Sequence, residues 1–351
     1  MTAVSNAMRC GRLISPPSFS GYHHNGLPHA TTLAHARPFL PLTLFALILS
    51  IFATTSAWAA SAADRVEFPA DDQGRPLRLY ARPERIVSLA PHATEMLFAA
   101  GAGGRVVAID PASDHPAAAV GLPRVSAWPR PDLEALRGAA PDLILLWGAG
   151  LRAEQRESVE RVAPVWVTEP TRLDEIPQTL RKLGRIAGDP LVAHAQAEQF
   201  SERLATLRAA VPDGPPVRVF YQAWGRPLIT VSNRDLIGDA IRTCGGENVF
   251  GGERAAARQV DPEAVRAARP QLVVLGDGST ADAPGGEPLA RWRGRWIGRP
   301  PALVAIAPEL LQRPTPRVLE GVDRLCLAIR ATVRGAQPSQ WPQSSGLPRS
   351  P

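Results

Sequence analysis

Two segments of this sequence match one another without gaps, and they begin 129 residues apart. Residues 132–146 are DLEALRGAAPDLILL, and residues 261–275 are DPEAVRAARPQLVVL. Each copy predicts a short helix, a proline break and a buried strand. Solenoid repeats have periods of about 20 to 50 residues, so a repeat of this length is domain-sized. The sequence therefore predicts two similar α/β lobes.

The first 59 residues have the pattern of a secretory leader. Arg37 and Pro38 precede an apolar run at 39–52, and residues 57–59 (Ala-Trp-Ala) form a small-x-small cleavage pattern. The run is shorter than the ~20 residues of a comfortable membrane span. We expect this signal peptide to direct export, with cleavage after Ala59. An uncleaved anchor and a start codon placed too early stay open as alternatives.

Removal of the leader lowers the net charge. The leader holds Arg9, Arg12 and Arg37 and no acids, which leaves 36 of the 39 basic residues against 33 acidic ones, a net charge of +3. These charges alternate along predicted helices, as on solvated helix faces. We expect no nucleic-acid partner.

Export also determines which cysteines remain and whether they can form a disulfide. Cys10 lies in the leader, so Cys244 and Cys326 remain as an even pair in an oxidising compartment. We predict a disulfide between them, with two buried free thiols as the alternative. The sequence has no CxxC or HExxH spacing, so we predict no metal site.

Strand and helix patterns divide the rest of the chain. We predict an N-terminal extension at 60–84, a first lobe at 85–172, a helical linker at 173–211, a second lobe at 212–335 and a disordered tail at 336–351. Within the linker, Asp189 and Pro190 predict the start of a long helix that ends near Val211. The predicted strands are 85–90, 106–109, 124–127, 143–146 and 165–168 in the first lobe, and 217–222, 227–231, 272–275 and 303–306 in the second.

Three tryptophans follow predicted strands. Trp128, Trp147 and Trp224 each stand at a strand's carboxyl end, where open α/β sheets bind ligands. Two come from the first lobe and one from the second. They predict a pocket for a large, flat or partly apolar ligand. The alternative is that these rings fill lobe edges.

For His92 and two glutamates, an ordinary structural role is a stronger explanation than a role in binding. His92 follows the first strand, where an imidazole can bind a metal in a ligand, but a solvated helix-cap residue is the favoured interpretation. Glu134 and Glu263 occupy equivalent places in the repeat, two residues after aspartates expected to cap their helices. The helix dipole accounts for acids there. The alternative is docking of a two-fold basic partner through one carboxylate on each lobe.

Five stretches of the chain together resemble one family. They are 85–101 (RIVSLAPHATEMLFAAG), Ser126-Ala-Trp128 followed by Asp132-Leu-Glu134, 141–147 (PDLILLW), 244–250 (CGGENVF) and 313–317 (RPTPR). They resemble the periplasmic cobalamin-binding members of the helical-backbone group of ABC-transporter substrate-binding proteins. That group also includes haem and ferric-siderophore binders. The resemblance covers residues 85–330.

The resemblance implies two Rossmann-like lobes with parallel-rich sheets, a long rigid backbone helix joining them and a ligand cleft between them. It implies a periplasmic monomer that delivers cobalamin or a related corrinoid to an ABC permease dimer with its ATPase subunits. The corrinoid would be transported cargo rather than a cofactor, and no chemistry would be done on it. Glu134 and Glu263 match glutamates that dock onto the permease, and Cys244 and Cys326 match a disulfide pair.

The resemblance also places the ligand pocket. Trp128 and Trp147 match pocket aromatics, and 309–313 matches a segment that borders the ligand. Ala112 and Ala257 stand where the family has a pocket tyrosine and a pocket tryptophan, and Trp224 is expected to refill part of that space. The expected ligand-binding residues are Pro91, His92, Ala112, Trp128, Trp147, Trp224, Ala257, Glu309, Leu310, Leu311, Gln312 and Arg313.

Two alternatives remain. The first is a haem or ferric-siderophore binder of the same fold. Haem binders of the group tend to use a cleft tyrosine, and the mature chain has only Tyr80 and Tyr221, whereas Arg226, Arg258 and Arg313 would suit a siderophore. The second is a secreted two-lobed α/β enzyme, such as a glycosyltransferase-like protein. The sequence contains no G-x-S-x-G elbow, dinucleotide fingerprint or P-loop, so we predict no enzyme.

Overall fold

A computed structural model of the chain describes residues 65–276, 278, 296 and 299–335. Contacts divide the chain into two compact units, 1–61 and 62–351, and all described residues belong to the second. The predicted leader and the predicted tail lie outside the described residues, and so does most of 276–286, where the sequence predicts a surface loop. In the described part, no helix combines the length and apolar character that crossing a membrane requires.

The first lobe is built on a parallel sheet with the strand order β4-β3-β5-β6. Alternate residues of its central strands enter different hydrophobic clusters: Leu143 and Leu145 face one, Ile144 and Leu146 the other. Side chains alternate across a strand, so this sheet is buried on both faces. The strands are β3 (Ile86–Ser88), β4 (Val106–Ile109), β5 (Leu143–Trp147) and β6 (Val165–Thr168).

Three helices accompany these strands: α2 (Pro91–Ala99), α3 (Leu133–Gly138) and α4 (Ala153–Glu160). The expected strand at 124–127 is wrong, because Arg124 makes only an isolated bridge to Ile109. Val125 and Ala127 are nevertheless buried. The alternation of polar and apolar residues at 124–127 shows which side chains face the core. A loop can produce this alternation as well as a strand can.

The N-terminal extension contains an antiparallel hairpin of β1 (Val66–Phe68) and β2 (Leu77–Leu79). The turn of this hairpin is held against the first lobe. The backbone N–H of Asp72 donates to the carbonyl of Val167 at 3.1 Å, and the indole of Trp166 donates to the carbonyl of Pro69 at 3.1 Å. The Asp72 carboxylate also pairs with Lys182 at 2.9 Å.

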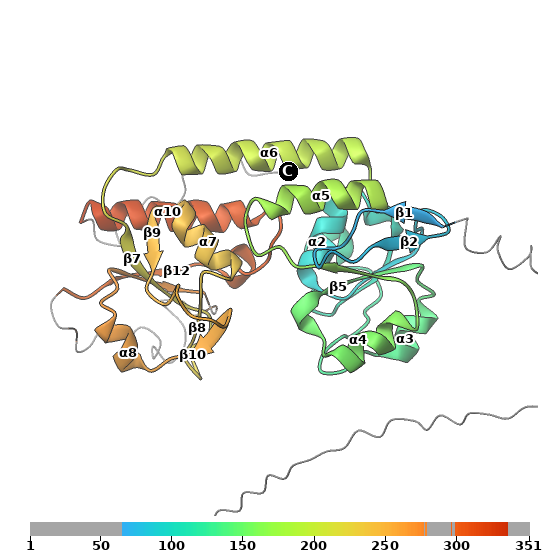
Figure 1. Ribbon diagram of the computed structural model, residues 1–351, viewed down its shortest axis with the longest axis horizontal. Coiled ribbons are helices and arrows are strands. Elements are labelled where there is room, and N and C mark those ends of the chain that lie inside the picture. The colour runs from blue at the N-terminus through green and yellow to red at the C-terminus, as the bar shows by residue number, and fades with distance from the viewer. Residues whose placement is uncertain (1–64, 277, 279–295, 297–298, 336–351) are drawn as a thin grey trace, which may run out of the picture. The chain divides into compact units, whose positions relative to one another are not determined.

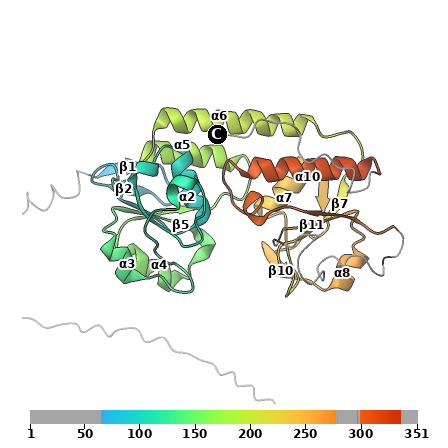
Figure 2. The same cartoon turned by 180° about the vertical axis from the view of Figure 1, so that it is seen from behind.

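Two helices form the linker, α5 (Glu175–Ile186) and α6 (Pro190–Ala209). The predicted start of α6 is confirmed, because the Asp189 carboxylate accepts hydrogen bonds from the N–H groups of Leu191 and Val192. At 1.5 Å per residue, its 20 residues extend about 30 Å. It packs along α5 and also contacts α2 and α10 (Figures 1 and 2). It thus braces helices of both lobes.

The second lobe repeats the plan with a parallel sheet in the order β12-β11-β7-β9. The expected place of the 227–231 strand in this sheet is wrong. The part of 227–231 that forms a strand is β8 (Ile229–Val231). This strand is bonded instead to β10 (Ala257–Gln259), and the two form a separate antiparallel sheet. The other elements are β7 (Val217–Gln222), β9 (Gly246–Asn248), β11 (Leu272–Leu275), β12 (Ala302–Ala305), α7 (Leu236–Thr243), α8 (Pro262–Ala267) and α10 (Val318–Val333).

The two copies of the repeat share an unusual backbone conformation at one position. Ala140 and Arg269, the residues before its prolines, both have φ of 45°, a left-handed conformation uncommon outside glycine. The carbonyls just before these sites are held by matching arginines: Arg85 binds those of Ala139 and Ala140, and Arg218 binds that of Ala268. This bonding favours the tight turn that leads each repeat helix into its strand.

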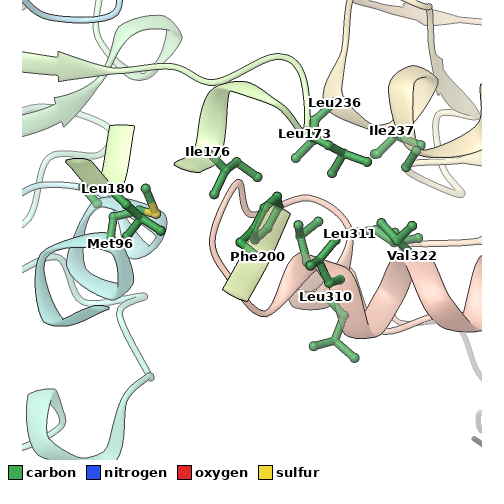
Figure 3. Packing of buried hydrophobic residues seen from close by; sticks show 14 of the residues in the cluster. Met96, Leu173, Ile176, Leu180, Phe200, Leu236, Ile237, Leu310, Leu311 and Val322 are labelled. Carbon is green, nitrogen blue, oxygen red and sulfur yellow. The ribbon is translucent and has the colours of Figure 1, made fainter. Parts of the chain in front are cut away.

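One hydrophobic cluster runs through the first lobe, the linker and the second lobe. Figure 3 shows Phe200 of α6 between Ile176 of α5 and Leu311, with Met96 of α2 and Val322 of α10 farther to either side. All five side chains are less than 4% exposed. The lobes therefore share a core at the linker.

The predicted disulfide is confirmed. Cys244 follows α7, Cys326 lies in α10, and their sulfurs are bonded across a sequence separation of 82 residues. The bond ties two helices that pack on each other in the second lobe. The alternative of two free thiols is wrong.

Replacing Cys244 and Cys326 together by Ala is expected to lower the free energy of unfolding by about 2 to 4 kcal/mol, because the bond restricts a long loop in the unfolded chain. Denaturant unfolding of the exported protein measures this loss. Reduction of the parent's disulfide is the matched control and should lower the value by a similar amount. A double variant as stable as the parent would contradict the expected contribution.

Candidate functional site

The expected ligand-binding residues gather after strands. Pro91 and His92 begin α2 directly after β3, and Ala112 follows β4. Trp147 ends β5, and Trp224 follows β7 by two residues. The remaining ones are Trp128, which follows the 124–127 segment, Ala257 on the β8–β10 pair, and residues 309–313, which follow β12.

The three tryptophans are unusually exposed. The exposed fractions are 77% for Trp128, 48% for Trp147 and 57% for Trp224. Trp166 of β6, by contrast, is completely buried. A ring that fills a lobe edge would resemble Trp166, so the exposure of the other three favours rings left open for a ligand. The indole of Trp224 is also oriented, because it donates to the carbonyl of Arg226 at 2.8 Å.

His92 is buried, so the favoured interpretation as a solvated cap residue is wrong. Its Nε2 lies 3.2 Å from the carbonyl oxygen of Thr168. A carbonyl only accepts, so Nε2 carries the proton and is engaged. Burial lowers the pKa of His92 to about 4, and the ring is neutral at neutral pH. His92 therefore ties the start of α2 to the end of β6.

Residues 309–313 divide between core and surface. Leu310 and Leu311 pack in the shared core, where Leu311 has no exposed surface. Gln312 is exposed and donates from Nε2 to the carbonyl of Gly276 at 2.7 Å and to the Tyr221 hydroxyl at 3.2 Å. The half-buried Glu309 belongs to a 3₁₀ turn, Pro308–Leu310. The two leucines thus support the segment that carries Gln312 and Arg313.

Arg313 joins the two lobes. Its Nη1 donates to the carboxylate of Glu95 on α2 at 3.0 Å and to that of Asp114, after β4, at 2.6 Å. Arg317, at the start of α10, also binds Glu95, through Nε and Nη2, each at 2.9 Å. The Glu95 side chain is only 3% exposed. A carboxylate of the first lobe is therefore held by two guanidinium groups of the second.

The arginines keep this buried carboxylate charged. Burial raises the pKa of Glu95, but the hydrogen bonds from Arg317 and Arg313 outweigh burial, and the pKa lies below its usual value. The hydrogen bond from Arg313 likewise holds the pKa of Asp114 below its usual range. Glu95, Asp114, Arg313 and Arg317 form a neutral group of two acids and two bases, which we call the interlobe cluster.

Sequence reasoning missed Glu95, Asp114 and Arg317. One signal was present: Glu95 is a charged residue within the apolar helix segment at 92–97, all of which is buried. A buried charge requires a partner. The partners are 218 and 222 residues away along the chain, and no local pattern identifies them.

The two repeat glutamates are exposed on α3 and α8. Glu263 pairs with Arg266 at 2.9 Å, whereas Glu134 makes no hydrogen bond or ion pair with another described residue. Asp132 caps its helix through Ala135 N–H, as expected. The expected cap by the Asp261 side chain is wrong, because no described N–H bonds to that carboxylate.

A polar cavity of about 360 Å³ lies between the N-terminal extension, the segment after β6 and helix α5, and it touches none of the expected ligand-binding residues. Its lining is Asp72, Glu169, Thr171, Glu175, Gln178, Thr179 and Lys182. Among the residues that the structure describes, no group of three or more His, Cys, Asp or Glu side chains is arranged to hold a metal ion.

The chain belongs to a family of periplasmic binding proteins, whose sequence profile matches residues 86–286. It is 34% identical over 255 residues to a vitamin B12-binding protein of Vibrio vulnificus (strain YJ016), covering 71% of this chain and 91% of that relative. It is 33% identical over 245 residues to one of Yersinia pestis (strain Pestoides F), covering 69% of this chain and 85% of the relative.

Solved structures share the fold. The periplasmic vitamin B12-binding protein BtuF of Vibrio cholerae superposes with a TM-score of 0.65 at 31% identity, over 72% of this chain and 99% of that one. The periplasmic heme-binding protein RhuT of Roseiflexus gives a TM-score of 0.61 at 23% identity, over 71% and 98%. The latter similarity supports the fold alone.

The low pKa of His92 predicts a pH dependence of stability. Its pKa is about 4 in the folded protein against 6.5 for a free side chain, so the unfolded chain binds more protons between these values. The free energy of unfolding should lose up to about 3 kcal/mol from this residue as the pH falls from 6.5 to 4.

His92→Gln keeps an N–H donor for the Thr168 carbonyl and does not titrate. The difference between the parent's and the variant's unfolding free energies, measured at several pH values, isolates the contribution of His92. Parallel curves between pH 6.5 and 4.5 would show that the histidine is not held neutral by burial.

Proposed function

We propose that this protein binds cobalamin or a related corrinoid in the periplasm and delivers it to an ABC importer. The observation that carries the proposal is the exposure of Trp128, Trp147 and Trp224 after strands of both lobes. A corrin is a large, flat macrocycle with an amide-bearing rim. Indole rings offer such a ligand broad, flat apolar contact. The names of the relatives support the same ligand.

A haem ligand is less well supported. Tyr221 is completely buried, and its hydroxyl accepts a hydrogen bond from Gln312. Tyr80 is exposed, but it follows β2 of the N-terminal hairpin, and its hydroxyl accepts from Arg65. Neither phenol stands at the carboxyl end of a parallel strand in an open position. An axial tyrosine for haem iron would have to come from one of them.

An anionic ferric siderophore is also disfavoured. Arg313 is engaged by Glu95 and Asp114, and Arg258 pairs with Glu253 at 2.5 Å. Arg226 interacts within the chain as well. Recognition of a highly charged anion needs cations whose charge is not already compensated. Arg258 and Arg313 would have to break existing ion pairs first, whereas a corrinoid with neutral amides makes no such demand.

The proposed role is binding and delivery without chemistry on the ligand. The corrinoid is cargo, and we infer no separate cofactor. The leader would export the chain and be removed after Ala59, and the mature protein would act as a monomer. The rival role as a secreted two-lobed enzyme has no nucleophile, base and oxyanion donor brought together among the described residues to support it.

Glu134 and Glu263 are proposed as the contacts with the permease dimer. The two lobes present them at equivalent positions of the repeat, each in the first turn of an exposed helix. Exposed carboxylates retain long-range attraction for a basic partner. Two contacts on one rigid body would reinforce each other.

Trp128→Ala and Trp147→Ala are each expected to weaken cobalamin binding by about 1 to 3 kcal/mol, because each removes a large contact surface from the ligand. Titration followed by tryptophan fluorescence and absorbance measures the loss. Tyr80→Ala removes an exposed aromatic ring away from the proposed pocket and is the matched control. Unchanged affinity in both tryptophan variants would remove these residues from the pocket.

Glu134→Arg with Glu263→Arg should retain cobalamin affinity but lose binding to the cognate permease, because like charges would then meet across the interface. Each single variant should be impaired less. Glu157→Arg with Glu202→Arg changes two other exposed acids by the same charge and is the control. If the double variant at Glu134 and Glu263 supports uptake of labelled cobalamin at the wild-type rate, the docking role is wrong. Both residues would then be only helix-end charges.

A further inference from the structure

We infer that the interlobe cluster of Glu95, Asp114, Arg313 and Arg317 is a lock that positions the two lobes for ligand and slows ligand release. The claim that the cluster positions the lobes concerns the protein without ligand. The part that concerns release rests on the proposed function.

The cluster joins elements of the two lobes through charged side chains. Glu95 lies on α2 and Asp114 follows β4, both in the first lobe, whereas Arg313 and Arg317 lead into α10 of the second. Arg317 binds both carboxylate oxygens of Glu95, each at 2.9 Å. A two-point contact of this kind fixes orientation as well as distance.

Opening the lobes at this point would expose a carboxylate that is now paired and buried. Glu95 sits in a helix whose neighbouring residues, 92–97, are all buried, so it has no route to solvent without movement of α2 or of the segment before α10. Separation of the pair before water enters leaves a charge uncompensated in an apolar setting. The cluster therefore favours one lobe arrangement over open ones.

Arg313 connects this lock to the expected ligand site. Besides Glu95 and Asp114, it approaches the carbonyl of Ala112 at 3.4 Å. Ala112 and Asp114 belong to the loop after β4, at the same sheet edge as Pro91 and Trp147. A change at Arg313 thus moves a loop of the first lobe and a segment of the second together.

The linker makes a second connection between the lobes. The N–H of Leu173, just before α5, donates to the Asp239 carboxylate of α7 at 2.9 Å, and Arg172 lies 3.8 Å from the same residue. These contacts hold the linker to the second lobe but do not reach α2 or the loop after β4. Loss of the cluster should therefore loosen the lobes without detaching them.

The test measures lobe separation without ligand. Spin labels at Glu157→Cys on α4 and Ala264→Cys on α8, in a Cys10→Ser background, report the distance between lobes, since Cys244 and Cys326 are bonded to each other. Glu95→Gln and Arg313→Gln are expected to broaden the distance distribution at a temperature where both variants are fully folded. Glu84→Gln, which removes an ion pair with Arg105 inside the first lobe, should not broaden it.

The same variants are then loaded with cobalamin, and release is followed by stopped-flow fluorescence. We expect the release rate to rise about tenfold or more for Glu95→Gln and Arg313→Gln, with a smaller change in the association rate. A purely structural role would lower the melting temperature and leave the distances and release rate as in the parent. That result would overturn the lock.

Two further outcomes are separable. If Glu95→Gln does not fold, the test relies on Arg313→Gln, in which Arg317 still pairs with Glu95. An unchanged interlobe distance distribution in Arg313→Gln would then overturn the lock. If the parent does not bind cobalamin, the proposed function fails, while the distance measurement still supports or overturns the positioning role.

Discussion

The requirement to keep the buried Glu95 carboxylate paired governs the arrangement of this protein. Among the described residues, only Arg313 and Arg317 form ion pairs with it, and both come from the second lobe. The hydrophobic cluster that runs beneath the linker stabilises contact between the lobes but is not directional. The ion pairs add direction, because a guanidinium and a carboxylate bind well only in a narrow range of geometries. Core and cluster together determine how the carboxyl ends of the two sheets are presented.

Charge compensation in this cluster also bears on the ligand. The arginine most favourably placed to attract an anion, Arg313, already has two acidic partners. The exposed aromatic surface proposed for the ligand is instead provided by indole rings. Such a site is suited to a large ring system with neutral polar groups on its rim, and the similarity to vitamin B12-binding proteins agrees with that chemistry. On the proposed function, selectivity would rest on shape and apolar contact more than on charge.

Local patterns in the sequence predicted much of the fold. The strand at 272–275 is a run of four apolar residues and has the predicted bounds, and Asp189 with Pro190 fixes the start of α6. β9 was missed because Gly246, Glu247 and Asn248 have little strand propensity and gain their conformation by pairing with β7. The 124–127 segment alternates like a strand, yet its pairing with β4 is limited to one bridge, between Arg124 and Ile109.

The candidate site likewise has a part that local patterns predict and a part that they do not. Exposed rings after strands follow from topology, so Trp128, Trp147 and Trp224 were identifiable from order along the chain. The pairing of Glu95 with Arg317 depends on the closure of 222 residues of chain and follows only from the tertiary structure.

A ligand-selection titration tests the central claim most directly. The exported protein is titrated in parallel with cobalamin, haemin and a ferric hydroxamate siderophore, and binding is followed by calorimetry. The account predicts saturable one-to-one binding of cobalamin, with haemin and the siderophore weaker by at least about tenfold, which corresponds to 1.4 kcal/mol. Equal or tighter binding of haemin or of the siderophore would contradict it.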